Sequence, residues 1–198
     1  IRRSDDAYRA HAANAWRAGV DGIYVFNLNY MRGPWDRIWR ELGDPGVLAD
    51  LDKIYHVSVM GDGHPEVEHY LPGGLKYVQR PRLCPDHPLE VLAGQMHVTT
   101  LSIADDPAAP SRRLRPKVRL NVKATGLAHG GELAVSVNGQ QLEQAPLTWP
   151  FANKDHWLEY EVEPRDVRQG DNRLEITLAE AAGGCTLHDV HLRLEHGP

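Results

Sequence analysis

Two alternating stretches decide the fold of this chain: KVRLNVKA at residues 117–124 and ELAVSVNGQQL at residues 132–142. In the first, apolar side chains at the even positions alternate with polar or charged ones at the odd positions. This period of two predicts a strand with one buried and one solvated face. The second stretch alternates likewise and places Asn138-Gly139 where a tight hairpin turn belongs.

Further short runs of this kind lie on both sides of the two stretches, separated by turn-forming residues. We expect strands over residues 75–79, 95–103, 117–124, 132–137, 157–162, 172–178 and 186–194. Frequent short strands and turns predict an antiparallel β-sandwich of jelly-roll type. Residues 104–111, ADDPAAPS, are too polar and too rich in proline for a strand, and we expect a surface loop there.

The beginning of the chain has helical spacing instead. Apolar residues recur at helical intervals from Asp5 to Ala18, which predicts an amphipathic helix. Ser4 can cap its N-terminus, and Gly19 stands where a glycine commonly ends a helix.

A strand is expected next. The run DGIYVFNLNY at residues 21–30 is continuously apolar at its centre, as is typical of a strand buried on both faces. Helices are expected over residues 35–42 and 45–55, the second with Asp44 as cap and Pro45 at its first position.

The chain therefore divides into two expected parts. Residues 1–58 form helix, strand and helix, residues 59–74 form a linker, and residues 75–198 form the sandwich. The linker is assigned because its glycine, proline and acidic residues show no periodicity. The expected fold class is α+β and multidomain.

Residues 8–30, YRAHAANAWRAGVDGIYVFNLNY, resemble the end of the (β/α)8 barrel in glycoside-hydrolase-like proteins, with the match running from Ala13 to Asn27. The resemblance implies that residues 1–58 are the terminal elements of a TIM-like barrel, whose strand ends at the mouth where such barrels hold their sites. The stretches GELAVSVNGQQL and HWLEYEVEPRDVRQGDNRLEITL resemble the accessory galactose-binding-like and carbohydrate-binding β-domains that follow these barrels.

This resemblance implies the C-terminal portion of a glycoside hydrolase. Glycosidic hydrolysis requires two carboxyl groups across the scissile bond. The expected strand ends in FNLNY without a carboxylate, Asp21 lies at its opposite end, and Asp36 is better interpreted as a helix-capping or surface residue. We therefore expect the catalytic carboxylates upstream of Ile1 and an inactive fragment. The alternative is a non-catalytic carbohydrate-binding or structural module, which could brace the barrel or form an oligomer interface.

The expected substrate contacts combine amides and aromatic rings. Asn27 and Asn29 can hydrogen-bond sugar hydroxyls, and Tyr30 or Trp35 can stack on a sugar ring. Trp149 is a further candidate, from a long loop of the sandwich. The alternative for each is local packing or satisfaction of backbone groups.

Other tryptophans are expected to pack rather than bind. Trp16 and Trp39 lie on helical faces and are predicted to be core residues. Trp149, Phe151, Trp157 and Tyr160 could form a carbohydrate platform, although packing in the core or in a loop is preferred. Trp157 and Tyr160 have opposite parity on one expected strand, so one of them should face the core.

Eleven histidines invite a metal hypothesis. The candidates are His64, His69, His87, His97, His188, His191 and His196. His64 and His69 have a zinc-like spacing without an accompanying cysteine pair, and His188 and His191 should point to opposite faces of a strand. We therefore interpret the histidines as solvated and expect no metal and no cofactor.

Bulk properties exclude some partners. The net charge of −5 without a basic stripe argues against nucleic acid, and no apolar run approaches the ~20 residues of a membrane span. Cys84 and Cys185 are expected to be buried thiols, with a disulfide left open. Carbohydrate is the expected partner; the oligomeric state is open, and a secreted or periplasmic location fits the parent protein.

Overall fold

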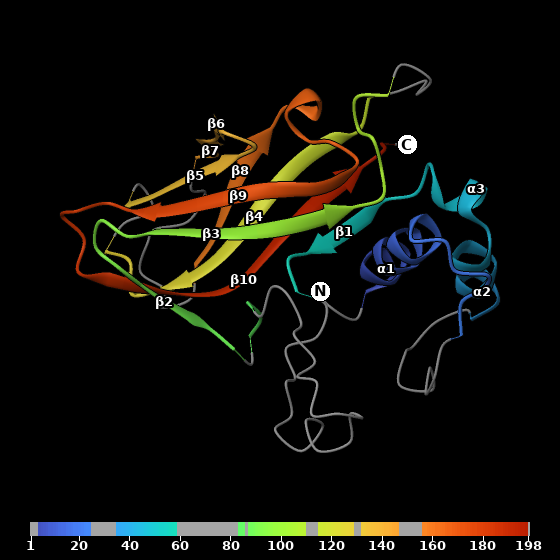
Figure 1. Ribbon diagram of the computed structural model, residues 1–198, viewed down its shortest axis with the longest axis horizontal. Helices are drawn as coiled ribbons and strands as arrows, with labels where there is room; N and C mark the ends of the chain where they lie inside the picture. Colours follow the sequence, from blue (N-terminus) through green and yellow to red (C-terminus); the bar gives the residue numbers. More distant parts are fainter. Residues whose placement is uncertain are drawn as a thin grey trace, which may run out of the picture.

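In the described part of the chain, the fold is a β-sandwich with three α-helices at one end. The computed structural model describes residues 4–24, 35–58, 83–85, 87–109, 115–128, 132–146 and 156–197. Within these ranges two antiparallel sheets pack face to face (Figure 1). The predicted antiparallel sandwich is therefore confirmed.

Two sheets make up the sandwich in the described part of the chain. The six-stranded sheet has the order β1 (Lys53–His56), β10 (Gly184–Glu195), β4 (Lys117–Thr125), β8 (His156–Val162) and β7 (Glu143–Gln144), with β2 (Leu89–Leu92) also pairing with β10. The four-stranded sheet has the order β3 (Met96–Ile103), β9 (Gly170–Leu178), β5 (Leu133–Val137) and β6 (Gln140–Gln141).

Strand β4 buries its apolar side chains on one face, as its alternating sequence predicts. Leu120 and Val122 are fully buried between the sheets and pack in one cluster with Val135 and Ile176 of the four-stranded sheet. Tyr160 adds a polar link, because its hydroxyl donates to the carbonyl oxygen of Leu133 at 3.1 Å. Burial raises the pKa of Tyr160, so the hydroxyl remains a donor.

The hairpin between β5 and β6 confirms the predicted turn. Val137 pairs with Gln140, which leaves Asn138 and Gly139 as the two turn residues. Both have positive φ, 49° and 85°. This is the signature of a type I′ turn, which matches the twist of the flanking strands.

Asn172 connects this hairpin to the turn before β9. Its side-chain oxygen accepts from the Arg168 amide at 2.9 Å and from the Asn138 side chain at 2.8 Å. Its amide group donates to the carbonyl oxygens of Arg168 and Gly170 at 2.8 and 3.0 Å. Asn172 is fully buried, so these bonds replace those it would make with water.

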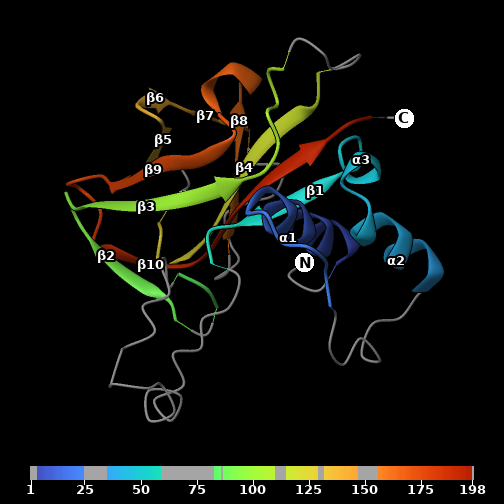
Figure 2. The ribbon, with the colours of Figure 1, turned by 45° about the vertical axis from the view of Figure 1, so that its right-hand side comes forward.

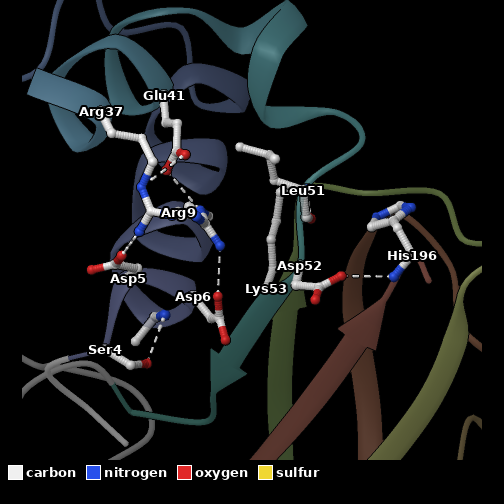
Figure 3. A network of polar contacts seen from close by, with 11 residues as sticks. Ser4, Asp5, Asp6, Arg9, Arg37, Glu41, Leu51, Asp52, Lys53 and His196 are labelled. Atoms are coloured by element: carbon white, nitrogen blue, oxygen red, sulfur yellow. Dashed lines mark hydrogen bonds and ion pairs between the residues drawn. The ribbon is translucent and has the colours of Figure 1, made fainter. Parts of the chain in front are cut away.

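Helix α1 (Asp5–Arg17) lies against β1 at one end of the sandwich (Figure 2). Ser4 caps it by accepting from the Ala7 amide, and Gly19 follows it with a φ of 86°, both as predicted. The buried Arg9 donates to Glu41 of α2 (Trp35–Gly43) at 2.9 Å and to Asp6 at 2.7 Å (Figure 3). This network fixes α1 against α2.

The helix predicted over residues 45–55 is wrong beyond its first turn. Asp44 caps and Pro45 begins α3 (Pro45–Leu48) as expected, but the helix then ends. Lys53–His56 form β1, which pairs along the edge of β10. Tertiary pairing overrides local propensity here, because Tyr55 is buried in the sandwich core, where the helix would not have placed it.

The described part of the segment at residues 21–30 does not contain the predicted strand. Residues 21–24 are not part of a strand, and the side chain of Tyr24 is 86% exposed. Two-sided burial is therefore wrong for Tyr24; the remainder of the segment lies outside the described residues.

The other strands agree with the prediction, with three additions. The strands expected over 95–103, 117–124, 132–137, 157–162, 172–178 and 186–194 correspond to β3, β4, β5, β8, β9 and β10. The short strands β2, β6 and β7 were not predicted, and residues 75–79 lie outside the described residues. The loop at 104–111 is not wholly on the surface, because Asp105 is only 7% exposed.

Candidate functional site

The outward face of the six-stranded sheet carries an unusual set of aromatic and polar side chains. Antiparallel register places residues of adjacent strands side by side on one face. One row across the sheet consists of His56, His191, Asn121 and Glu159, and the next of Asp189, Lys123 and Trp157. We refer to these seven residues as the outer-face cluster.

Trp157 is the exposed aromatic residue of this cluster. Its side chain on β8 is 39% exposed, whereas Tyr160 on the same strand is 1% exposed and faces the core. The predicted division of the two rings between opposite faces is confirmed. The Trp157 ring lies tilted by 60° against the ring of His191, with the centroids 4.9 Å apart. The packing fixes the indole while leaving part of it open to solvent.

A buried group of ionisable side chains lies beside Trp157. His56, Asp189 and His191 are 6%, 3% and 1% exposed. The Nδ1 atom of His56 is 3.4 Å from Oδ1 of Asp189, and the two imidazole centroids are 5.1 Å apart. Each residue offers a ligand atom within 4.8 Å of the others, so among the described residues this group could hold a metal ion.

The solvated-histidine interpretation is therefore wrong for His191. His56 was not among the sequence candidates, because it was assigned to the end of the first domain, and β1 was not predicted. We also expected the side chains of His188 and His191 to point to opposite faces of the strand, which assumed regular alternation between them. The register shifts between Leu187 and Asp189, and this bulge interrupts simple alternation at His188, which lies 2.8 Å from the hydroxyl of Thr125.

A second buried polar group lies on the inner side of β1. Asp105 accepts from the Tyr55 hydroxyl at 2.5 Å and forms an ion pair with Lys53 at 3.2 Å. Burial, together with the neighbouring Asp105 carboxylate, raises the pKa of Tyr55 far above its ordinary value. Lys53 is only 1% exposed, so this group ties the loop after β3 to β1 rather than offering a binding site.

The five predicted substrate contacts cannot be placed at this face. Asn27, Asn29, Tyr30 and Trp149 lie outside the described residues, and so does the side chain of Trp35 at the start of α2. The geometry therefore leaves them as predictions. The aromatic residue that the structure shows exposed at this face is Trp157. The sequence signal for it is the opposite parity of Trp157 and Tyr160 along one strand.

Two tryptophans of the helical part have different environments. Trp16 packs against the apolar cluster of α1, α2 and α3, and its indole nitrogen donates to the Leu42 carbonyl oxygen at 2.8 Å. Its predicted packing role is confirmed. Trp39 is 45% exposed, so its prediction as a core residue is wrong. The buried side of α2 carries Ile38 and Leu42, and Trp39 lies at the flank of that side.

Two further expectations concern the state of the cysteines and the presence of a membrane-spanning helix. Cys84 and Cys185 are both buried free thiols, as expected. Burial, with a smaller contribution from Glu132, raises the pKa of Cys185 to about 11. Among the helices in the described ranges, none has the length and apolar character needed to cross a membrane.

Comparison with known proteins gives distant structural similarities. No protein-family model and no curated protein matches the chain. A β-porphyranase of glycoside hydrolase family 86 from the human gut bacterium Bacteroides plebeius matches 73% of this chain at 16% identity and a TM-score of 0.42. BuGH86 in complex with neoagarooctaose matches 57% at 13% identity and a TM-score of 0.41. This chain spans 20% and 18% of those two chains.

Proposed function

We propose that this chain is part of a carbohydrate-active protein and that its sandwich binds a sugar chain over Trp157. The observation that carries the proposal is the partly exposed indole, held by His191 in a face that otherwise presents polar side chains. An aromatic face beside hydrogen-bonding groups suits a sugar ring, whose C–H face is apolar and whose hydroxyls are polar.

The neighbours of Trp157 supply those hydrogen-bonding groups. Lys123 on β4 lies directly opposite Trp157, and Glu159 follows Trp157 by two residues on β8. Lys123 and Glu159 therefore share the face of the sheet on which Trp157 lies. Asn121 already donates to Glu159 at 3.3 Å, which orients the carboxylate. Lys123 and Glu159 thus offer a donor and an acceptor to sugar hydroxyls, while the buried Asn121 supports Glu159.

The finer assignments extend the same proposal. The strand order β2-β10-β4-β8, facing β3-β9-β5-β6, supports a sandwich of jelly-roll type. We further propose that the segment ahead of β1 belongs to the end of a glycoside-hydrolase barrel whose catalytic carboxylates lie upstream, whereas β1 itself pairs with β10 of the sandwich. Exposed apolar side chains at Val20, Tyr24 and Trp39 support a missing neighbour for this part.

Calorimetric titration with oligosaccharides tests sugar binding, and neoagarooctaose is the first probe because one of the compared structures contains it. We expect Trp157→Ala to weaken binding at least about tenfold, which corresponds to a loss of about 1.4 kcal/mol. Trp39→Ala is the matched control, since that tryptophan is also exposed but lies on α2.

Equal affinities of the wild-type protein and Trp157→Ala would reject Trp157 as the binding residue. No heat with any member of an oligosaccharide panel would favour the alternative, a sandwich that only braces its parent protein. Assay of the isolated chain for sugar cleavage completes the test, because turnover would contradict the upstream location of the carboxylates.

A further inference from the structure

The buried group on β1 and β10 can be assigned a further role, binding a ligand other than a sugar. We propose that His56, Asp189 and His191 bind one divalent transition-metal ion of the zinc class. Two imidazole nitrogens and one carboxylate oxygen are a ligand set that zinc accepts, with a fourth position left for water or another ligand. No comparison and no sequence motif pointed to these three residues together.

Their separation suits ligands of one ion. Two ligands about 2.1 Å from a tetrahedral ion lie about 3.4 Å apart, from the standard bond length and angle. The distance between His56 Nδ1 and Asp189 Oδ1 is 3.4 Å. A charge-assisted hydrogen bond between the same groups would be about 2.7–2.9 Å. The pair is thus spaced more like two ligands than like a strong hydrogen-bonded pair.

The strands hold the third ligand in place. His56 and His191 are directly opposed in the antiparallel pairing of β1 and β10. Asp189 precedes His191 by two residues on β10, so the two side chains share a face. All three positions are therefore set by sheet register rather than by a loop, which keeps the reorganisation needed for binding small.

The two ring nitrogens of His56 have different surroundings. Within the described part of the chain, Nε2 of His56 is buried without a hydrogen-bond partner. Its Nδ1 atom is the one that faces Asp189, at 3.4 Å from Oδ1. Metal ligation uses the lone pair of a neutral imidazole nitrogen, so Nδ1 is the atom of His56 that would bind the ion.

The positive charge of Lys123 opposes a cation. Lys123 lies opposite Asp189 across the pairing of β4 and β10 and therefore shares its face. Its ammonium group should weaken metal binding through like-charge repulsion. Removing that charge while keeping the length of the side chain, as in Lys123→Met, should therefore tighten metal binding roughly threefold or more.

The experiment uses the untagged chain, freed of metal with EDTA and then titrated with Zn²⁺ by calorimetry. We expect one ion per chain and a rise in the thermal midpoint, because the ion binds the folded state. Asp189→Asn and His191→Ala should each weaken binding at least about tenfold. His97→Ala is the control, since His97 lies on β3 in the other sheet.

Several outcomes are decisive. Asp189→Asn has nearly the shape of the original residue, so it keeps the test usable if His191→Ala does not fold. Tighter binding by Lys123→Met would support the site, since a purely structural His–Asp contact does not predict it. Absence of Zn²⁺ binding by the wild-type chain, or unchanged binding in both ligand variants, would overturn the proposal.

Discussion

Replacement of Asp105 by alanine should destabilise this protein more than any surface change. The carboxylate accepts from the Tyr55 hydroxyl at 2.5 Å and lies 3.2 Å from the ammonium group of Lys53. The substitution removes it while Lys53 stays 1% exposed. The buried ammonium would then lose this counter-ion, and the tyrosine hydroxyl would lose this acceptor.

The magnitude follows from these two losses. Breaking a buried ion pair by removing one partner costs about 3–5 kcal/mol, because the other charge stays buried. Tyr55→Phe removes only the hydrogen bond to a charged acceptor, which is worth about 1.5–3 kcal/mol. The two effects overlap at Asp105, so we expect about 3–5 kcal/mol for Asp105→Ala and a smaller loss for Tyr55→Phe.

Urea unfolding followed by circular dichroism measures both losses as free energies of unfolding. Asp106→Ala is the matched control, because the neighbouring carboxylate is exposed and accepts a local bond from the Ala108 amide at 3.1 Å. It should cost less than about 1 kcal/mol. A loss of less than about 1 kcal/mol for Asp105→Ala would refute the reasoning.

Two further predictions concern buried polar groups. Asn172→Ala should lower the free energy of unfolding by about 2–4 kcal/mol in the same urea assay, because several buried backbone groups lose a partner at once; a loss near zero would show that water replaces the amide. Since the Cys185 pKa is raised to about 11 from 9.0, its stabilising contribution is complete below about pH 9 and is lost as pH rises toward 11. Cys185→Ala should therefore lose less stability than the wild-type protein over that pH interval, and parallel pH curves would contradict this.

Sequence pattern predicted the strands that alternate and missed those that do not. β4 and β9 have a clear period of two, so their inward faces could be assigned before the fold was known. β1 could not, because all four of its residues are buried and it directly follows a helical stretch. Its strand conformation depends on pairing with β10, more than a hundred residues away.

The same limit applies to the candidate sites. Parity predicted that Trp157 and Tyr160 face opposite sides, and this is what makes Trp157 available to a ligand. His56 and Asp189 are 133 positions apart, and only the register of β1 on β10 brings them together. No local spacing carries that information, so a histidine search by short motifs could not find the group.

The pairing of β1 with β10 also has a consequence for synthesis on the ribosome. β10 occupies the interior of the six-stranded sheet, between β1 and β4. Neither neighbour can complete its hydrogen bonding until residues 184–195 have emerged, although β1 is made well over a hundred residues earlier. During that interval β1 has an unsatisfied edge, which is open to mispairing. Correct assembly of this sheet is therefore a late event of translation, and slow release or chaperone shielding of residues 53–56 should favour it.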